Sequence, residues 1–118
     1  MEFDPNKPIY LQICDSICEQ ILSGAISPED RIPSVREFGA SIGVNPNTAA
    51  RSYEKLTDAG IIYNKRGIGY YVTAPAKQLI LEAEKQRFLN EEVPAFIKKM
   101  ELLGVNPSDI FNIKTGSK

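Results

Sequence analysis

The chain contains no histidine and only two cysteines, and this scarcity narrows the chemistry that it can perform. Histidine is the side chain that most often serves as a general base. No phosphate-binding glycine loop, activated cysteine or acidic cluster with metal-ligand spacing takes its place. We therefore expect neither an enzyme nor a bound cofactor or metal, although a site built on aspartate or lysine stays open.

The two cysteines, Cys14 and Cys18, lie four residues apart in a segment expected to be helical, from residue 8 to about residue 23. Zinc requires about four ligands, and the chain offers no second cysteine pair. A disulfide across one helical turn would have poor geometry. We expect two buried free thiols that pack as small apolar side chains.

Long apolar runs are missing as well. No stretch approaches the roughly 20 residues that a membrane-spanning helix needs, and residues 1–4 are too polar and acidic to open a secretory signal. We expect a cytoplasmic protein without membrane contact. Its 118 residues, of which 42% are hydrophobic and 25% charged, allow one small domain plus an appendage.

Residues 33–60 contain the signals for two short helices joined by a tight turn. Ser34 and Glu37 have the spacing of a capping box, which begins the first helix, and Gly43 provides the backbone freedom that ends it. Apolar residues then recur with helical spacing, which predicts one buried face on each helix. These faces consist of Val35, Phe38, Gly39 and Ile42 in the first helix, and of Ala49, Tyr53 and Leu56 in the second.

The second helix is expected to begin only three residues after the first, with Asn45 as its N-cap and Pro46 at its first position. Such a short connection is typical of a helix-turn-helix. The polar face of this helix can bind DNA, because Asn can hold a base edge while Thr and Arg reach phosphates or further bases. A three-helix bundle with a solvated polar face explains the same spacing equally well. The polar face consists of Asn47, Thr48, Arg51 and Lys55.

Two short β-prone runs follow, at residues 61–63 and 70–73, and they flank a tip at residues 64–69 that contains Lys65 and Arg66. This arrangement is typical of a β-hairpin. Glycines in the tip allow its backbone to approach a surface closely. A basic hairpin directly behind a helix-turn-helix is a wing, which favours DNA binding over the plain bundle.

Four motifs in this order resemble the winged-helix domain of the GntR family of bacterial transcription regulators. Each motif is weak alone, but the order and spacing of all four make a strong signal. The resemblance covers about residues 8–74, and the Asn-Pro-Asn-Thr variant is most similar to the YtrA subfamily. The motifs are Pro-Ser-x-Arg from Pro33, Gly-Val-Asn-Pro-Asn-Thr from Gly43, Leu-x-x-x-Gly-Ile from Leu56, and Arg-Gly-x-Gly-Tyr-Tyr-Val from Arg66.

The resemblance implies that Arg36 reads a guanine, that the start of the second helix contacts bases and phosphates, and that the wing tip enters the minor groove. Many relatives carry arginine where this chain has Pro46, so the preferred DNA site should differ from theirs. Taken with the polar face of the second helix, these matches make Ser34, Arg36, Asn45, Asn47, Thr48, Arg51, Lys65, Arg66 and Gly67 the candidate DNA-binding residues.

After Pro75 the composition predicts a helix over residues 76–103, which Pro94 should kink. Its second half carries an apolar seam that a small winged domain cannot bury alone, so we expect a second subunit to cover it. The alternative is that the helix folds back onto its own domain. The seam consists of Leu89, Val93, Phe96, Met100 and Leu103, and a turn after Gly104 should lead into a short last helix.

These patterns predict a mainly α fold with a small β-hairpin, divided into a winged helix-turn-helix domain (1–75), a helical dimerisation segment (76–113) and a disordered tail (114–118). Residues 31–66 carry a net charge of +3 and the remainder −4, which suits a basic binding surface on an acidic body.

We predict a homodimeric transcription regulator, a repressor, that binds an inverted repeat in double-stranded DNA. The alternative is a winged helix that binds protein or structured RNA. Roughly forty residues follow the wing, too few for a ligand pocket of usual volume, so a small-molecule effector stays open but is not indicated.

Overall fold

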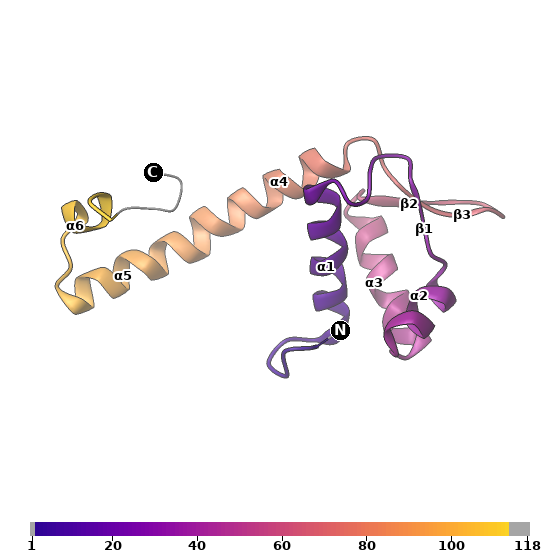
Figure 1. Cartoon of the computed structure of the whole chain (residues 1–118), viewed down its shortest axis with the longest axis horizontal. Helices are drawn as coiled ribbons and strands as arrows, with labels where there is room; N and C mark the ends of the chain where they lie inside the picture. The colour runs from indigo at the N-terminus through magenta and orange to yellow at the C-terminus, as the bar shows by residue number, and fades with distance from the viewer. Residues whose placement is uncertain (1, 114–118) are drawn as a thin grey trace. The chain divides into compact units, whose positions relative to one another are not determined.

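The computed structural model describes residues 2–113, and the chain divides into two compact units, Met1–Glu82 and Ala83–Lys118. In the first unit three helices pack with a small sheet, and the helices and the hairpin follow the order that the sequence predicts (Figure 1). Its elements are α1 (Ile9–Ser23), β1 (Arg31–Ile32), α2 (Val35–Ile42), α3 (Pro46–Asp58), β2 (Ile62–Lys65), β3 (Gly69–Val72) and the first part of α4 (Ala76–Arg87).

Local signals at the helix ends are confirmed. Helix α1 ends at Gly24, whose φ of +88° is a left-handed conformation that glycine adopts without strain. Helix α2 begins at the expected capping box, and α3 begins with Asn45 as its cap and Pro46 in its first turn. The residues before α1 are tied to this helix, because the Gln12 side chain exchanges hydrogen bonds with the backbone of Asp4.

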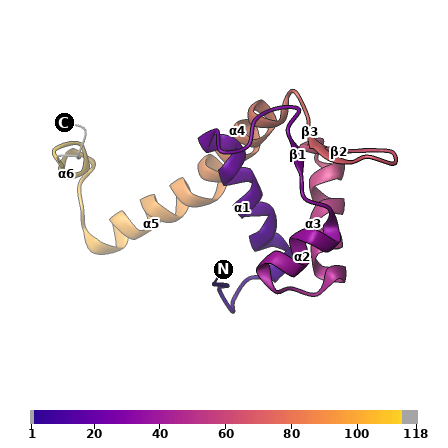
Figure 2. The same cartoon turned by 45° about the vertical axis from the view of Figure 1, so that its right-hand side comes forward.

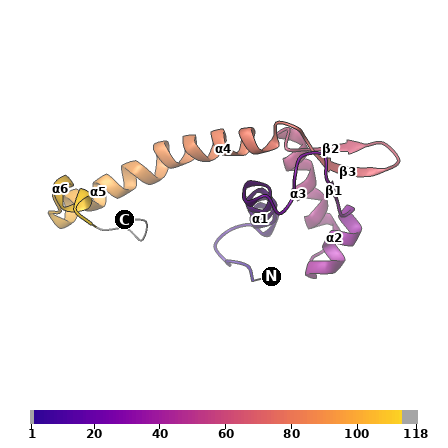
Figure 3. The same cartoon turned by 45° about the horizontal axis from the view of Figure 1, so that its top comes forward.

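The predicted hairpin is present, and it belongs to a three-stranded antiparallel sheet with the order β1–β3–β2. It projects beyond the helices of its unit (Figures 2 and 3). The third strand, β1, is a correction, because the sequence predicts only the two strands of the hairpin. Arg31 and Ile32 pair with Tyr71 and Tyr70, and burial of the Ile32 side chain holds this short edge strand in place.

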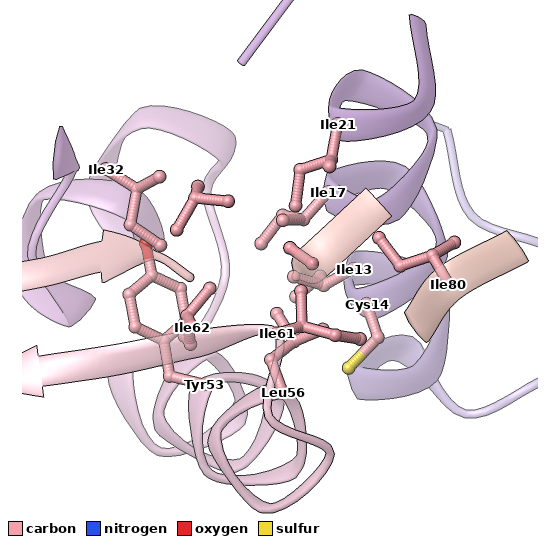
Figure 4. Packing of buried hydrophobic residues seen from close by; sticks show 12 residues of the cluster. Ile13, Cys14, Ile17, Ile21, Ile32, Tyr53, Leu56, Ile61, Ile62 and Ile80 are labelled. Atoms are coloured by element: carbon pink, nitrogen blue, oxygen red, sulfur yellow. The ribbon is translucent and has the colours of Figure 1, made fainter. Parts of the chain in front are cut away.

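Tyr53 of α3 belongs to the hydrophobic core, where Ile32 and Ile62 of the sheet lie beside it and the isoleucines of α1 lie on the other side of the cluster (Figure 4). Its side chain is 1% exposed, and its hydroxyl donates a hydrogen bond to the Pro33 carbonyl at 2.6 Å. Burial raises the pKa of this phenol, so it stays neutral. Tyr70 meets Tyr53 edge to face at 5.0 Å and is therefore the strand tyrosine that faces inward. Ala76 and Ile80, from the segment assigned to dimerisation, are also buried in this core.

The second unit consists of the end of α4, a π-helix η1 (Phe88–Glu92), α5 (Val93–Leu103) and α6 (Pro107–Phe111). Pro94 has no backbone N–H to donate to the preceding turn of a helix. The chain forms a π-turn just before it, in which the Val93 N–H donates to the Phe88 carbonyl. The predicted last helix is confirmed. The predicted tail at 114–118 lies outside the described residues.

The second unit has no buried core of its own: from residue 81 to residue 113, no described side chain is buried. None of the helices that the structure describes is long and apolar enough to cross a membrane.

Candidate nucleic-acid interface

The start of α2 positions Arg36, the residue that the resemblance assigns to guanine. Glu37 accepts a hydrogen bond from the Ser34 amide at 3.0 Å, and the Ser34 hydroxyl accepts one from the Glu37 amide at 3.1 Å. The hydrogen bonds from the Ser34 backbone and hydroxyl lower the pKa of Glu37, so the cap is strongest above that pKa and weakens on acidification.

Arg36, in the first turn behind this cap, is exposed. Within residues 2–113 its guanidinium has no hydrogen-bond or ion-pair partner. Ser34 differs from it, because the Ser34 hydroxyl is already engaged in the cap. The arrangement presents the Arg36 side chain at a rigid helix start with its donors available for a base edge.

At the start of α3 the two asparagines have different surroundings. Asn45 uses its side-chain oxygen as the cap and accepts the Asn47 amide at 2.8 Å, which leaves only its NH₂ group for another partner. Asn47 is exposed, and no intramolecular hydrogen bond engages its side chain within the described range. Thr48 is half-buried. Asn47 is therefore the side chain in this turn with both a donor and an acceptor available.

Arg51, one turn further along α3, is held against α1. Its guanidinium carbon lies 4.0 Å from the centre of the Tyr10 ring, a cation–π contact that restrains the side chain while its charge stays exposed. The neighbouring Ser52 is fully buried and donates a hydrogen bond to the Tyr10 carbonyl at 3.0 Å. The two contacts join the first turn of α1 to the middle of α3.

A cleft of about 500 Å³ lies between α3 and the hairpin, and it contains residues that the sequence patterns did not indicate. Asn64 lines it from β2, because its partner in the sheet is the inward-facing Tyr70. Strand alternation could have identified Asn64. Glu54 and Asp58 line the cleft from the second half of α3, so only the first half of that helix offers a non-acidic surface to DNA.

The wing tip is a tight turn in which the Ile68 amide donates to the Lys65 carbonyl at 2.8 Å. Gly67 has a φ of +78°, which favours glycine there. Arg66 is exposed, and Lys65 places its ammonium 5.0 Å from the centre of the Tyr71 ring. The Ile68 carbonyl in this turn also accepts a hydrogen bond from Arg31 Nε at 3.4 Å, from the neighbouring strand.

The cysteines are not among the candidate residues of this surface, and the expectation that both are buried holds for Cys14 only, since Cys18 is half-buried. Cys14 is buried, its Sγ donates to the Ser52 carbonyl at 3.5 Å, and burial raises its pKa to about 11. Such a thiol stays protonated and unreactive at neutral pH. Among the described residues no group of histidine, cysteine, aspartate or glutamate side chains could hold a metal ion.

Residues 9–72 match the family described as bacterial regulatory proteins, gntR family. This chain belongs to the GntR family. The matched range runs from the first residue of α1 to the last residue of β3, so it covers the helix-turn-helix and the wing together. The protein is thus a DNA-binding transcription regulator of the GntR family and not an enzyme.

Two regulators of Bacillus subtilis are similar to nearly the whole chain. The chain is 36% identical to the uncharacterized HTH-type transcriptional regulator YhcF, over 97% of this chain and 93% of YhcF. It is also 36% identical to the HTH-type transcriptional repressor YtrA, over 89% of this chain and 82% of YtrA. Within the GntR family this regulator is therefore YtrA-like.

Two solved structures extend the comparison. A GntR-family regulator of Bacteroides thetaiotaomicron superimposes with a TM-score of 0.74 at 49% identity, covering 86% of this chain and 88% of that one. The AraR DNA-binding domain, crystallised in complex with an operator, superimposes with a TM-score of 0.56 at 27% identity, covering 62% of this chain and 93% of that one. The winged helix of this GntR-family protein thus resembles one whose bound state with DNA is known.

Proposed function

We propose that this GntR-family regulator is a repressor that binds an inverted-repeat operator as a homodimer. The observation that carries the dimer is the lack of any buried side chain after Ile80 in the described chain. Phe96 and Leu103 are 51% and 64% exposed, and apolar area of this extent on a soluble helix calls for a partner. The simplest partner is the same helix of a second copy.

The other members of the predicted seam differ in their exposure. Leu89 is 56% exposed, and Val93 and Met100 are half-buried. Residues of α5 and α6 also line an apolar cavity of about 440 Å³, to which Phe96, Met100 and Ile110 contribute. Pairing of two copies along α5 would cover this surface without any change within either helix.

A dimer would account for the inverted repeat of the proposed operator. Two winged helices related by a two-fold axis present Arg36 and the start of α3 to two half-sites of opposite orientation. One module alone makes too few base contacts to select its site within a genome. Repression is supported by the similarity to YtrA, a transcriptional repressor, and a dimer that occupies a promoter would exclude polymerase.

The test is a titration of the purified protein against a duplex from its own upstream region, followed by fluorescence anisotropy. The matched control duplex has one half-site scrambled while its length and composition are unchanged. We expect tight binding to the intact duplex and weak, salt-sensitive binding to the control. Equal affinity for both duplexes, or preference for a folded RNA of the same sequence, would favour the alternative of a winged helix that binds RNA or protein.

The wing gives a separate prediction. Replacing Lys65 by alanine should weaken binding to intact and scrambled duplexes by a similar factor, because a phosphate contact carries no sequence information. The slope of log affinity against log salt should fall by about 1. Anisotropy titrations at several salt concentrations measure both quantities. A loss confined to the intact operator would instead assign a base contact to Lys65.

A further inference from the structure

The face of the sheet that points away from the helices carries a row of polar and aromatic side chains. Register places Arg31 opposite Tyr71, and Tyr71 opposite Tyr63. Side chains of directly paired residues lie on the same face. Ile32 and Tyr70, the next pair along, face the core instead. We call Arg31, Tyr63, Lys65 and Tyr71 the outer sheet face.

Contacts hold the outer sheet face in a defined arrangement. The rings of Tyr63 and Tyr71 stack with centres 5.8 Å apart and planes 28° from parallel. Lys65 lies over the Tyr71 ring, and its amino group is 5.0 Å from the ring centre. Cations held against an aromatic ring keep their full charge while they lose few conformations on binding.

The Arg31 side chain extends from the edge strand across the hairpin toward the wing tip, and a glycine leaves space for its guanidinium. Gly69, the residue beneath its path, has a φ of +143°. A Cβ at this position would lie 3.0 Å from the Arg31 Nε. Any other residue would therefore push the guanidinium away from the Ile68 carbonyl that it contacts.

The charge along this face is unequal. Arg31 and Lys65 lie on the side of the wing tip and are continuous with the exposed Arg66. Among residues 2–113, the one carboxylate hydrogen-bonded to the face is that of Glu29, which accepts the Tyr63 hydroxyl at 2.8 Å. Besides this carboxylate, the face has the cations of Arg31 and Lys65 and the Tyr71 hydroxyl as donors, which complement a phosphate backbone.

We propose that the outer sheet face is a second DNA surface, which binds phosphates of the duplex that flanks the operator. The inference rests on the proposed function, because the wing tip must first occupy its groove. Continuity with the tip places duplex DNA, rather than another protein, beside Arg31 and Lys65. Contacts of this kind read no sequence, and they make affinity depend on the length of the flanking DNA.

The experiment compares a minimal operator with one extended at both ends by about 10 base pairs, one helical turn. We expect the parent protein to bind the extended duplex more tightly, with a salt slope steeper by about 1 for each additional phosphate that it neutralises. Replacing Arg31 by glutamine should abolish this increase in affinity and leave the affinity for the minimal operator unchanged. Tyr71→Phe, which retains the ring stack and loses only the hydroxyl, should reduce the increase in part.

Lys77→Gln, which removes an exposed cation of α4, is the matched control and should retain the full increase. Equal affinity of the parent for both duplexes would overturn the inference. It would also be overturned if Arg31→Gln lowered the affinity for both duplexes by the same factor, because Arg31 would then only stabilise the conformation of the wing. An equal increase from single-stranded extensions would also overturn it. A protein that fails to bind the minimal operator would instead refute the proposed function.

Discussion

Replacing Arg36 by alanine is expected to lower affinity for the intact operator by about 1–3 kcal/mol, roughly 5- to 150-fold, while binding to scrambled DNA changes little. The reason is the position of the side chain. Arg36 is exposed directly behind the α2 cap, and no residue in the described chain engages its guanidinium. The loss should therefore appear in base recognition and not in the stability of the helix.

Two further measurements distinguish a loss of base recognition from a loss of stability or of phosphate attraction. Unfolding midpoints of the parent and Arg36→Ala should agree, because the Ser34–Glu37 capping box remains intact. Arg36→Lys should recover phosphate attraction but not the two-pronged contact to guanine, so it should retain non-specific binding and lose discrimination. Arg36→Ala that binds the intact operator as tightly as the parent would remove Arg36 from the reading surface.

Introducing a charge into the seam should have the second large effect. Phe96→Asp is expected to convert the proposed dimer to a monomer, because it places a carboxylate in the surface that the proposed partner covers. Operator affinity should then fall by roughly 10²- to 10⁴-fold, since the two half-sites no longer bind as one unit. Sedimentation measures the first effect and anisotropy the second.

Lys98→Asp is the matched control, because it introduces the same carboxylate on the same helix at an exposed position outside the predicted seam. It should remain dimeric. Circular dichroism should show the winged domain intact in both variants, since its core ends at Ile80. A Phe96→Asp protein that is still dimeric and binds the operator normally would place the dimer contact elsewhere and contradict the predicted seam.

The features that the sequence predicts correctly are those whose physics is local. The capping box of α2, the left-handed Gly43 that ends this helix and the Asn45 cap with Pro46 behind it each act within a few residues. The wing tip is equally local, because Gly67 and the short turn around it need no distant partner. Local determinants of this kind also place Arg36 and Asn47 at exposed helix starts.

Features that depend on distant partners were not predictable in the same way. β1 is two residues long and exists because Ile32 has a place in the core and β3 offers an open edge. The Tyr10–Arg51 contact joins residues of two helices. The cleft lined by Asn64 exists only once the hairpin lies beside α3.

From the sequence alone, the positions of the helix ends, the basic wing and the order of motifs identify a winged helix of the GntR type. Helical spacing and turn chemistry suffice to predict the helices and the wing, because each acts over one or two turns of chain, whereas the family follows from the resemblance of the motifs. The pairing of Arg31 with the wing, the restraint of Arg51 and the two acidic residues in the cleft depend on how the folded elements pack. That packing is a property of the whole core, because it emerges when segments from Ile13 to Ile80 are buried together.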